Sequence, residues 1–439
     1  MKGGIIIKKI LIAFIILLLT SFPVLAKDSG SVYVMKIKGP IGPVTDTYFK
    51  RVLEEAKKHD AMCLVVEMDT PGGLMDSMKD IMQKIINSEI PVVVYVSPGG
   101  ASATSAGVFI TLSAHVAAMA PNTNIGAAHP VMIGENGEQQ MSKEMKEKIT
   151  NDSVALIKTT ADKKGRNMEW AEKAVRESVS ATEKEALQLK VVDLVAANLT
   201  ELLKSIDGLK IETVKGTVVL NTSGAIVKEI PMSSTEKFLD VLSNPNVAYI
   251  LIILGTYGLI YELASPMSIF PGVVGGICII LAFFALGTLP VNYAGLALLV
   301  FAFILFIIDI KAPTHGILTA GGIISMILGS VFLFNSDLPF YQVSWGIILG
   351  VVGMTTIFFV FIITTVLRSH KKKVTTGAEG LTGQKGIVKT PLEPRGQIML
   401  DGALWRAITA GRYVKEGEEV LVKKVDGLTV YVEPCENKQ

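Results

Sequence analysis

The sequence predicts three consecutive parts: an α/β domain, a multi-span α-helical membrane region and a small all-β barrel. β-rich and helical segments alternate up to about residue 203, which favours an α/β domain with a mostly parallel sheet. Nearly every residue from Asn246 to Leu367 is apolar, and the mean hydropathy of the chain is +0.47. Five short strands separated by glycines follow Lys373, a pattern typical of a closed barrel of the OB type.

The first 26 residues have the pattern of a secretory signal. Lys2, Lys8 and Lys9 precede an apolar run at 10–19, and small residues follow at 24–26. Charge, apolar run and small residues in this order mark a signal peptide, with an uncleaved anchor helix as the alternative. Either form exports the segment that follows.

We expect the exported α/β domain at 27–203. Its β-rich runs are at 31–37, 62–68, 90–96 and 115–119. Helical patterns are at 46–58 with Asp46 as N-cap, at 74–87 and at 142–163. Thr182 and Glu185 have the spacing of a capping box for a further short helix.

Two glycine-rich stretches interrupt this alternation, each at the end of a strand. The first is Asp69-Thr70-Pro71-Gly72-Gly73, whose glycines allow a turned backbone to present its N–H groups. The second, 97–107, is a loop of small residues that leads into an apolar helix near Ser105. A hydroxyl at a helix N-terminus lies where the helix dipole stabilises developing negative charge.

Each stretch alone has an ordinary structural interpretation. Pro-Gly-Gly usually forms only a turn, and a serine at a helix start is usually only an N-cap. Together, after adjacent strands of one α/β unit, they supply a nucleophile and an oxyanion hole at one edge of the sheet.

Three motifs in this order resemble the ClpP/crotonase superfamily and, within it, the long NfeD-type membrane serine proteases. They are Asp69–Gly73, Ala103–Gly107 and Ala120–Ala127. The C-terminal segment resembles the NfeD C-terminal domain at 380–383, 401–405 and 425–428. The resemblance implies a ClpP/crotonase-like fold for the first domain and a serine endopeptidase with a Ser–Lys dyad.

The resemblance also implies the roles of individual residues. The nucleophile falls on Ser105, and the oxyanion donors fall on the backbone N–H groups of Gly73 and Ala106. The general base falls on Lys148, which precedes Ile-Thr-Asn. A lysine base must have a lowered pKa, and a half-buried position beside Ile149 would provide it. His129 is the alternative base, although its match to the histidine of soluble ClpP enzymes is offset by one residue.

The rest of the chain completes the topology. A linker with a small hairpin is expected at 204–245, about five membrane helices at 246–368, and the barrel at 374–435. The basic run 368–373 marks the cytoplasmic side by the positive-inside rule. An odd number of spans then places the α/β domain outside the cell membrane and the barrel inside.

The sequence therefore predicts a membrane-anchored serine endopeptidase without metal or cofactor. The three cysteines suggest no metal site, and a net charge of +2 gives no case for nucleic-acid binding. The resemblance implies hydrophobic segments of membrane proteins as substrates, contact with membrane lipid, a stomatin-like (slipin) partner and homo-oligomers. The alternatives are a non-enzymatic membrane scaffold and a crotonase-type acyl-CoA enzyme, which uses the same paired N–H groups on a thioester.

Overall fold

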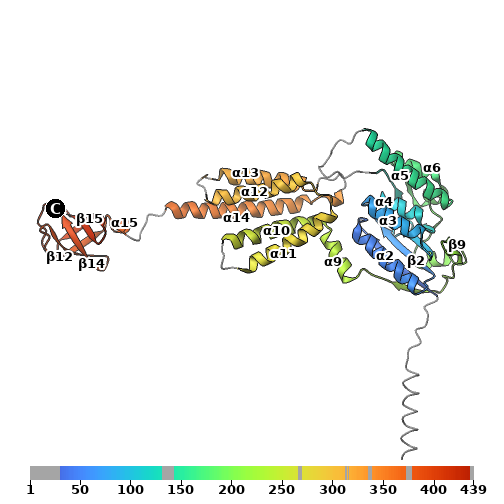
Figure 1. Cartoon of the computed structure of the whole chain (residues 1–439), viewed down its shortest axis with the longest axis horizontal. Helices are drawn as coiled ribbons and strands as arrows, with labels where there is room; N and C mark the ends of the chain where they lie inside the picture. The colour runs from blue at the N-terminus through green and yellow to red at the C-terminus, as the bar shows by residue number, and fades with distance from the viewer. Residues whose placement is uncertain are drawn as a thin grey trace, which may run out of the picture. The chain divides into compact units, whose positions relative to one another are not determined.

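The computed structural model of the chain describes residues 30–130, 143–264, 269–311, 314, 316–334, 339–371 and 378–435. The predicted signal peptide lies outside these residues, as do Lys372 and Lys373 of the basic run. Figure 1 shows the helices and strands of all three predicted parts. The three-part fold class predicted from the sequence is confirmed.

A six-stranded parallel sheet forms the centre of the α/β domain. Its strand order is β11-β1-β2-β3-β5-β8, and every neighbouring pair is parallel. The strands are β1 (Ser31–Lys38), β2 (Cys63–Asp69), β3 (Val92–Val96), β5 (Val116–Met119), β8 (Leu194–Val195) and β11 (Ile226–Glu229). β3 has the sequence Val-Val-Val-Tyr-Val and all five of its residues are buried, as expected for a strand covered on both faces.

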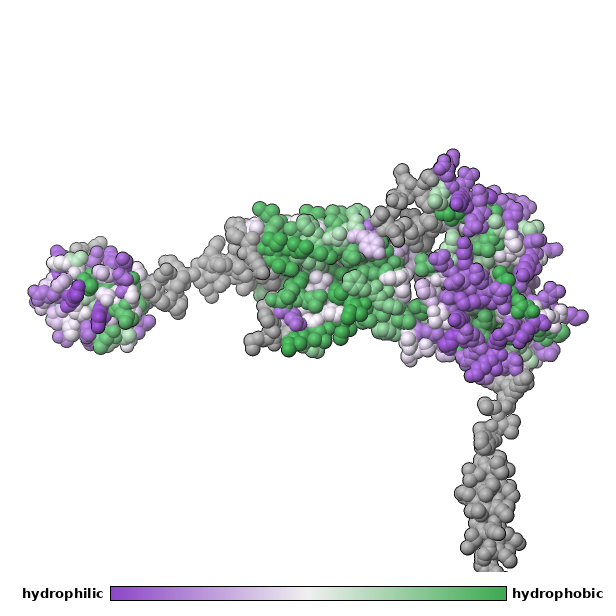
Figure 2. Space-filling model, in the orientation of Figure 1, coloured by the Kyte–Doolittle hydropathy of each residue, from purple (hydrophilic) through white to green (hydrophobic). Residues whose placement is uncertain are grey.

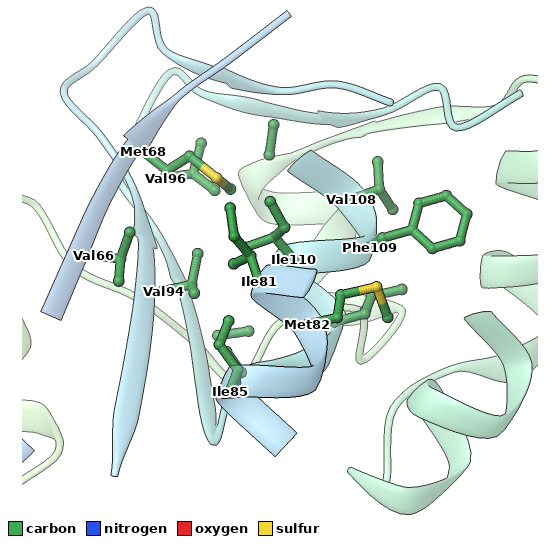
Figure 3. Close-up of a cluster of buried hydrophobic side chains, with 14 of the residues drawn as sticks. Val66, Met68, Ile81, Met82, Ile85, Val94, Val96, Val108, Phe109 and Ile110 are labelled. Atoms are coloured by element: carbon green, nitrogen blue, oxygen red, sulfur yellow. The ribbon is translucent and has the colours of Figure 1, made fainter. Parts of the chain in front are cut away.

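One face of the sheet is covered by α2 (Pro43–Lys58), α3 (Met75–Ile86) and α4 (Ala106–Ser113). Figure 3 shows Val66 and Met68 of β2 and Val94 of β3 directed at Ile81 and Ile110 of these helices. The predicted N-cap Asp46 is wrong, because α2 begins at Pro43, with Gly42 as N-cap. Proline has the φ of a first helical residue and needs no N–H there, so it starts the helix one turn earlier.

The other face of the sheet is covered by elements at the start of the predicted linker, 204–245. The helix α8 (Leu199–Ser205) and the hairpin of β9 (Lys210–Thr213) and β10 (Gly216–Val219) lie there. Leu202, Ile211 and Leu220 from these elements are buried against Val34 and Val65 of the sheet. The hairpin therefore contributes to the core of the domain.

The second half of the segment 204–245 also belongs structurally to the α/β domain. β11 pairs with β1 as an edge strand, and α9 (Ser234–Leu242) packs on α2. Arg51 of α2 donates from Nε and Nη2 to both carboxylate oxygens of Glu236, each over 2.8 Å. Tyr48 donates to the carbonyl of Ile230 over 2.5 Å. These contacts attach the chain to α2 just before the apolar helices begin.

Further helices and a small sheet complete the α/β domain. α5 (Lys143–Lys163) contacts α4 and α6 (Met168–Arg176). A small sheet joins β4 (Ser102–Ala103), β6 (Asn124–Gly126) and β7 (Ser180–Thr182). The predicted capping box of Thr182 and Glu185 is confirmed at the start of α7 (Glu183–Gln188).

Among the described residues, five apolar helices follow α9 in the region predicted to hold the membrane helices. They are α10 (Pro245–Ala264), α11 (Ile269–Thr288), α12 (Tyr293–Lys311), α13 (Ile317–Phe332) and α14 (Trp345–Lys371). Among the described residues, α10 and α11 are long and apolar enough to cross a membrane, and the other three contain shorter apolar stretches. Figure 2 shows that this part has a largely hydrophobic surface. Gly258 of α10 and Gly275 of α11 meet so closely that a Cβ on Gly258 would lie 2.8 Å from the Cα of Gly275. These glycines therefore serve helix packing.

The C-terminal part is a closed barrel of five strands in the order β12-β13-β14-β16-β15. They are β12 (Lys385–Thr390), β13 (Arg395–Leu400), β14 (Ala403–Thr409), β15 (Glu419–Asp426) and β16 (Thr429–Pro434). β14 and β16 are parallel, and the other neighbours are antiparallel. Alternating residues such as Ile398, Ala407 and Val430 fill its interior.

Candidate active site

The two glycine-rich stretches lie side by side where β2 and β3 end. The Thr70 N–H donates to the carbonyl of Ser102 over 2.8 Å, and the Thr104 N–H donates to the carbonyl of Thr70 over 3.1 Å. The Asp69 carboxylate also accepts a hydrogen bond from the Ser102 N–H over 3.1 Å. The structure therefore brings the two motifs together at one edge of the sheet, as the strand order predicts.

Ser105 occupies the N-cap position of α4 without acting as a side-chain cap. No hydrogen bond runs from its hydroxyl to the helix, although serine usually makes one at this position. Its backbone has φ 51° and ψ −112°, a conformation that non-glycine residues rarely adopt. Its N–H donates to the carbonyl of Ala127 over 2.6 Å, which fixes this turn against the third motif. The half-buried hydroxyl is thus available for chemistry.

Gly72 passes directly over Ser105. A Cβ on Gly72 would lie 2.6 Å from the Cβ and 3.1 Å from the Oγ of Ser105, and its φ is +116°. A Cβ on Gly73 would lie 2.1 Å from the carbonyl oxygen of Ile41. Both positions exclude any side chain, so the backbone itself covers the serine.

The predicted oxyanion donors are backbone N–H groups on either side of Ser105. Ala106 is the first residue of α4, where a helix N–H has no partner within the helix. Among the described residues, neither the Ala106 N–H nor the Gly73 N–H has a hydrogen-bond acceptor. Two unpaired N–H groups, one at a helix N-terminus, can bind a developing oxyanion.

Lys148 lies in the first two turns of α5, and its side chain is exposed. The expected half-buried position is therefore not found, because the buried residues of α5 begin only at Ser153 and continue with Val154, Ile157 and Ala161. Among the described residues, the side chain of Lys148 has no hydrogen-bond or ion-pair partner.

His129, the alternative base, is held by α6. Its Nδ1 lies 2.8 Å from the carbonyl oxygen of Val175, and the preceding Ala128 N–H donates to the carbonyl of Ala174 over 2.9 Å. A ring that donates from Nδ1 to a carbonyl leaves Nε2 as the acceptor. Among the described residues, Ser105 Oγ has a hydrogen bond with neither His129 nor Lys148.

A third basic residue, Lys164, has a strongly shifted pKa but lies elsewhere. Burial, followed by repulsion from Arg166, lowers its pKa to about 8. Lys164 interacts with His115, whose ring accepts a hydrogen bond from the Val92 N–H at the start of β3. That is the amino end of the strands, opposite to Ser105, so Lys164 is not a candidate base.

The structure adds two residues that the sequence did not single out. The Ile41 N–H donates to the carbonyl of Gly72 and the Ile41 carbonyl accepts from the Leu74 N–H, both over 2.8 Å, which fixes the glycine loop. The Thr70 hydroxyl is buried and accepts from the Gly72 N–H over 3.1 Å. Thr70 lies within the first motif and could have been found there, whereas Ile41 lies about thirty residues upstream with no local signal.

Fold and site together define a class: a membrane protein whose α/β domain holds a serine at a helix N-terminus, beneath a glycine loop. Family models match along the chain. They describe the NfeD1b N-terminal domain at 31–213, the NfeD integral membrane domain at 246–365, and the NfeD-like C-terminal, partner-binding domain at 378–434. The chain belongs to the NfeD family of membrane proteins.

Two curated relatives match almost end to end. The membrane-bound protease PH1510 of Pyrococcus horikoshii is 38% identical over 435 residues, which cover 97% of this chain and 98% of that protein. The membrane protein NfeD1b of Bacillus subtilis is 28% identical over 429 residues, covering 92% and 93%. Among solved structures, the 1510-N membrane protease specific for a stomatin homolog from Pyrococcus horikoshii is 37% identical. The match covers 49% of this chain and 99% of the chain in that structure, with a TM-score of 0.43.

Proposed function

We propose that this protein is a membrane-anchored serine endopeptidase. The observation that carries the proposal is the uncapped hydroxyl of Ser105, held at a helix N-terminus beneath Gly72 and beside two unpaired N–H groups. This arrangement suits a nucleophile that forms a tetrahedral intermediate. A relative that is 38% identical over nearly the whole chain is named a protease, which supports the same activity.

In the proposed mechanism, Ser105 Oγ attacks the carbonyl carbon of the scissile peptide bond. Lys148 takes the hydroxyl proton, and the Gly73 and Ala106 N–H groups hold the oxyanion. Collapse of the intermediate breaks the C–N bond, and the amine leaves with the proton from the lysine. Water then hydrolyses the acyl-enzyme by the reverse sequence and regenerates Ser105.

The exposure of Lys148 sets a condition on this mechanism. A lysine acts as a general base only where it is desolvated, so Lys148 must lose water when the substrate binds. A hydrophobic peptide lying beneath the glycine loop and against α5 would exclude that water. This condition fits the proposed substrates, which are hydrophobic segments of membrane-associated proteins. His129 remains the alternative base, with Nε2 as the acceptor.

The proposed setting follows the topology predicted from the sequence. The α/β domain lies outside the cell membrane, α10–α14 cross it and the barrel lies in the cytoplasm. We propose that the barrel binds a stomatin-like (slipin) protein and that the protease domain forms homo-oligomers. The description of the C-terminal family as partner-binding supports the role of the barrel.

Labelling with a fluorophosphonate probe tests the proposed activity. The purified full chain should be labelled on the peptide that contains Ser105, and Ser105→Ala should abolish both labelling and peptide hydrolysis. Ser102→Ala is the matched control, because Ser102 lies in the same loop and its contacts with Asp69 and Thr70 are made by the backbone. An active Ser105→Ala protein, or labelling that moves to Ser102, would overturn the assignment. An unlabelled wild-type chain would favour the scaffold or the acyl-CoA enzyme.

A further inference from the structure

The outer face of the barrel formed by β13, β14 and β16 has a regular arrangement of side chains. Buried and exposed residues alternate along each strand, so the exposed ones face outward. Arg395 of β13 lies opposite Ile408 of β14, which lies opposite Tyr431 of β16. In the next row, Gln397 lies opposite Arg406, which lies opposite Thr429. The two arginines are therefore diagonal neighbours on adjacent strands.

A cavity of about 440 Å³ opens on this face. Its walls combine both arginines, the apolar Ile408, the ring of Tyr431, and the polar groups of Thr429 and Asp426. Diagonal neighbours on adjacent strands are roughly 7–8 Å apart, so two guanidinium groups can reach one short ligand from two sides. The cavity is thus shaped for a ligand that has both charged and apolar groups.

The charged side chains around the cavity indicate that the ligand carries negative charge. Among the described residues, neither Arg395 nor Arg406 has an ion pair or a side-chain hydrogen bond. Asp426 supplies one carboxylate at the same cavity, which leaves one positive charge in excess. Planar guanidinium groups that are not already paired bind carboxylates through two parallel hydrogen bonds.

The surroundings of the cavity favour a protein ligand. Large apolar side chains are exposed around it on the same barrel, with Leu404 at 59% and Leu428 at 80% exposure. Figure 2 shows hydrophobic patches between hydrophilic residues on the visible side of the barrel. Arginine and tyrosine beside apolar side chains are typical of the centres of protein interfaces. Single-stranded nucleic acid needs a continuous basic groove with several stacking rings, and Tyr431 is the one aromatic residue lining this cavity.

We propose that the outer face of β13, β14 and β16 is the partner-binding surface of the barrel, and that it takes a segment with acidic and apolar side chains. Carboxylates of that segment pair with Arg395 and Arg406, while an apolar side chain packs between Ile408 and Tyr431. The inference rests on the proposed partner-binding role of the barrel, and it adds the surface and the chemistry of the bound segment.

The test uses the full chain in detergent micelles and short fluorescein-labelled peptides. The wild-type chain should bind a peptide of alternating glutamate and leucine, measured by fluorescence anisotropy, and should bind the glutamine–leucine counterpart much more weakly. Arg395→Gln and Arg406→Gln should each weaken binding about tenfold, since each removes a charge-assisted pair. Arg412→Gln is the matched control, because Arg412 is an exposed arginine of the same barrel outside the cavity.

Reversing the charge of both arginines tests the surface by a change in peptide preference, which can be measured even if the wild type binds weakly. The double variant Arg395→Glu with Arg406→Glu should prefer a lysine–leucine peptide, provided that its thermal melting matches the wild type. If the wild type and the double variant bind the glutamate–leucine peptide equally, the proposed binding surface is wrong. Arginine-dependent binding of a single-stranded oligonucleotide, without peptide binding, would overturn the assignment to a protein segment.

A stomatin-like protein added to the same samples separates this inference from the proposed function. If the double variant binds that protein as well as the wild type does, the proposed binding surface is wrong, but the proposed stomatin-like partner is supported. If the wild type does not bind it but binds the acidic peptide through both arginines, the surface stands and the proposed partner is wrong.

Discussion

Gly72→Ala should inactivate the protein through a single methyl group. The added Cβ would lie 2.6 Å from the Cβ of Ser105, whereas ordinary contacts begin near 3.4 Å. The loop and the serine must therefore separate by about 0.8 Å. Misplacement of a reacting group by about 1 Å costs on the order of 100-fold in rate, so we expect a loss of this size.

Gly39→Ala is the matched control for this change. Gly39 has φ +107° and Gly72 has φ +116°, so alanine strains the backbone in the same region at both positions. A Cβ on Gly39, however, would meet no atom within 4 Å. Each variant should lose about 1–3 kcal/mol of stability from backbone strain, and only Gly72→Ala should lose activity.

The assay compares probe labelling and hydrolysis of a fluorogenic hydrophobic peptide for both variants, with melting followed by circular dichroism. Rates are taken per folded molecule at a temperature where both variants are folded. A Gly72→Ala protein with wild-type turnover would refute the close approach of the loop to Ser105. Equal inactivation by Gly39→Ala would show that backbone strain, and not contact with the serine, causes the loss.

Three further predictions concern the base, the topology and the stability of the α/β domain. Lys148→Ala should remove nearly all turnover and His129→Ala should cost less, whereas the reverse pattern in the same hydrolysis assay would leave a Ser–His mechanism. A reporter fused after Lys373 should behave as cytoplasmic and one fused near Leu203 as exported, and finding both on one side would mean an even number of spans. Glu236→Gln should lower the stability of the α/β domain at pH 7 by about 1–3 kcal/mol, since it breaks a charge-assisted pair. The hydrogen bond from the guanidinium on α2 lowers the pKa of Glu236 below its unfolded value of about 4.3. This stability is therefore present above the unfolded pKa and lost as pH falls through the folded pKa. Thermal melting of both forms at pH 7 and at successively lower pH should show the difference shrink as the pH falls below about 4.3, and a difference that does not shrink in acid would contradict the assignment.

Local signals predicted most of the elements and the place of the serine. A run of β-branched residues such as 92–96 favours a buried strand, and the small-residue loop before Ser105 favours a helix start near that residue. The order of strands and helices then gives a parallel sheet, because parallel neighbours need crossover connections. The meeting of the two glycine-rich motifs follows from their positions after adjacent strands.

Contacts between distant segments could not be predicted in this way. β11 has a largely exposed pattern and reads as a connector, yet it pairs with β1 nearly two hundred residues earlier. Ile41 fixes the glycine loop through its backbone alone, so its side chain gives no signal. The exposure of Lys148 depends on where α5 begins to pack, which the periodicity of its apolar residues does not reveal.

The place of β11 has a practical consequence for isolating the α/β domain. A chain cut after residue 203 would lose the hairpin whose Ile211 and Leu220 complete one side of the core. It would also leave β1 as a bare edge, with unpaired backbone groups that invite aggregation. A soluble form that ends after Leu242 keeps the edge strand, the hairpin and the Arg51–Glu236 pair, and stops before the first apolar helix. We therefore expect the α/β domain to fold as a unit about forty residues longer than the predicted segment 27–203.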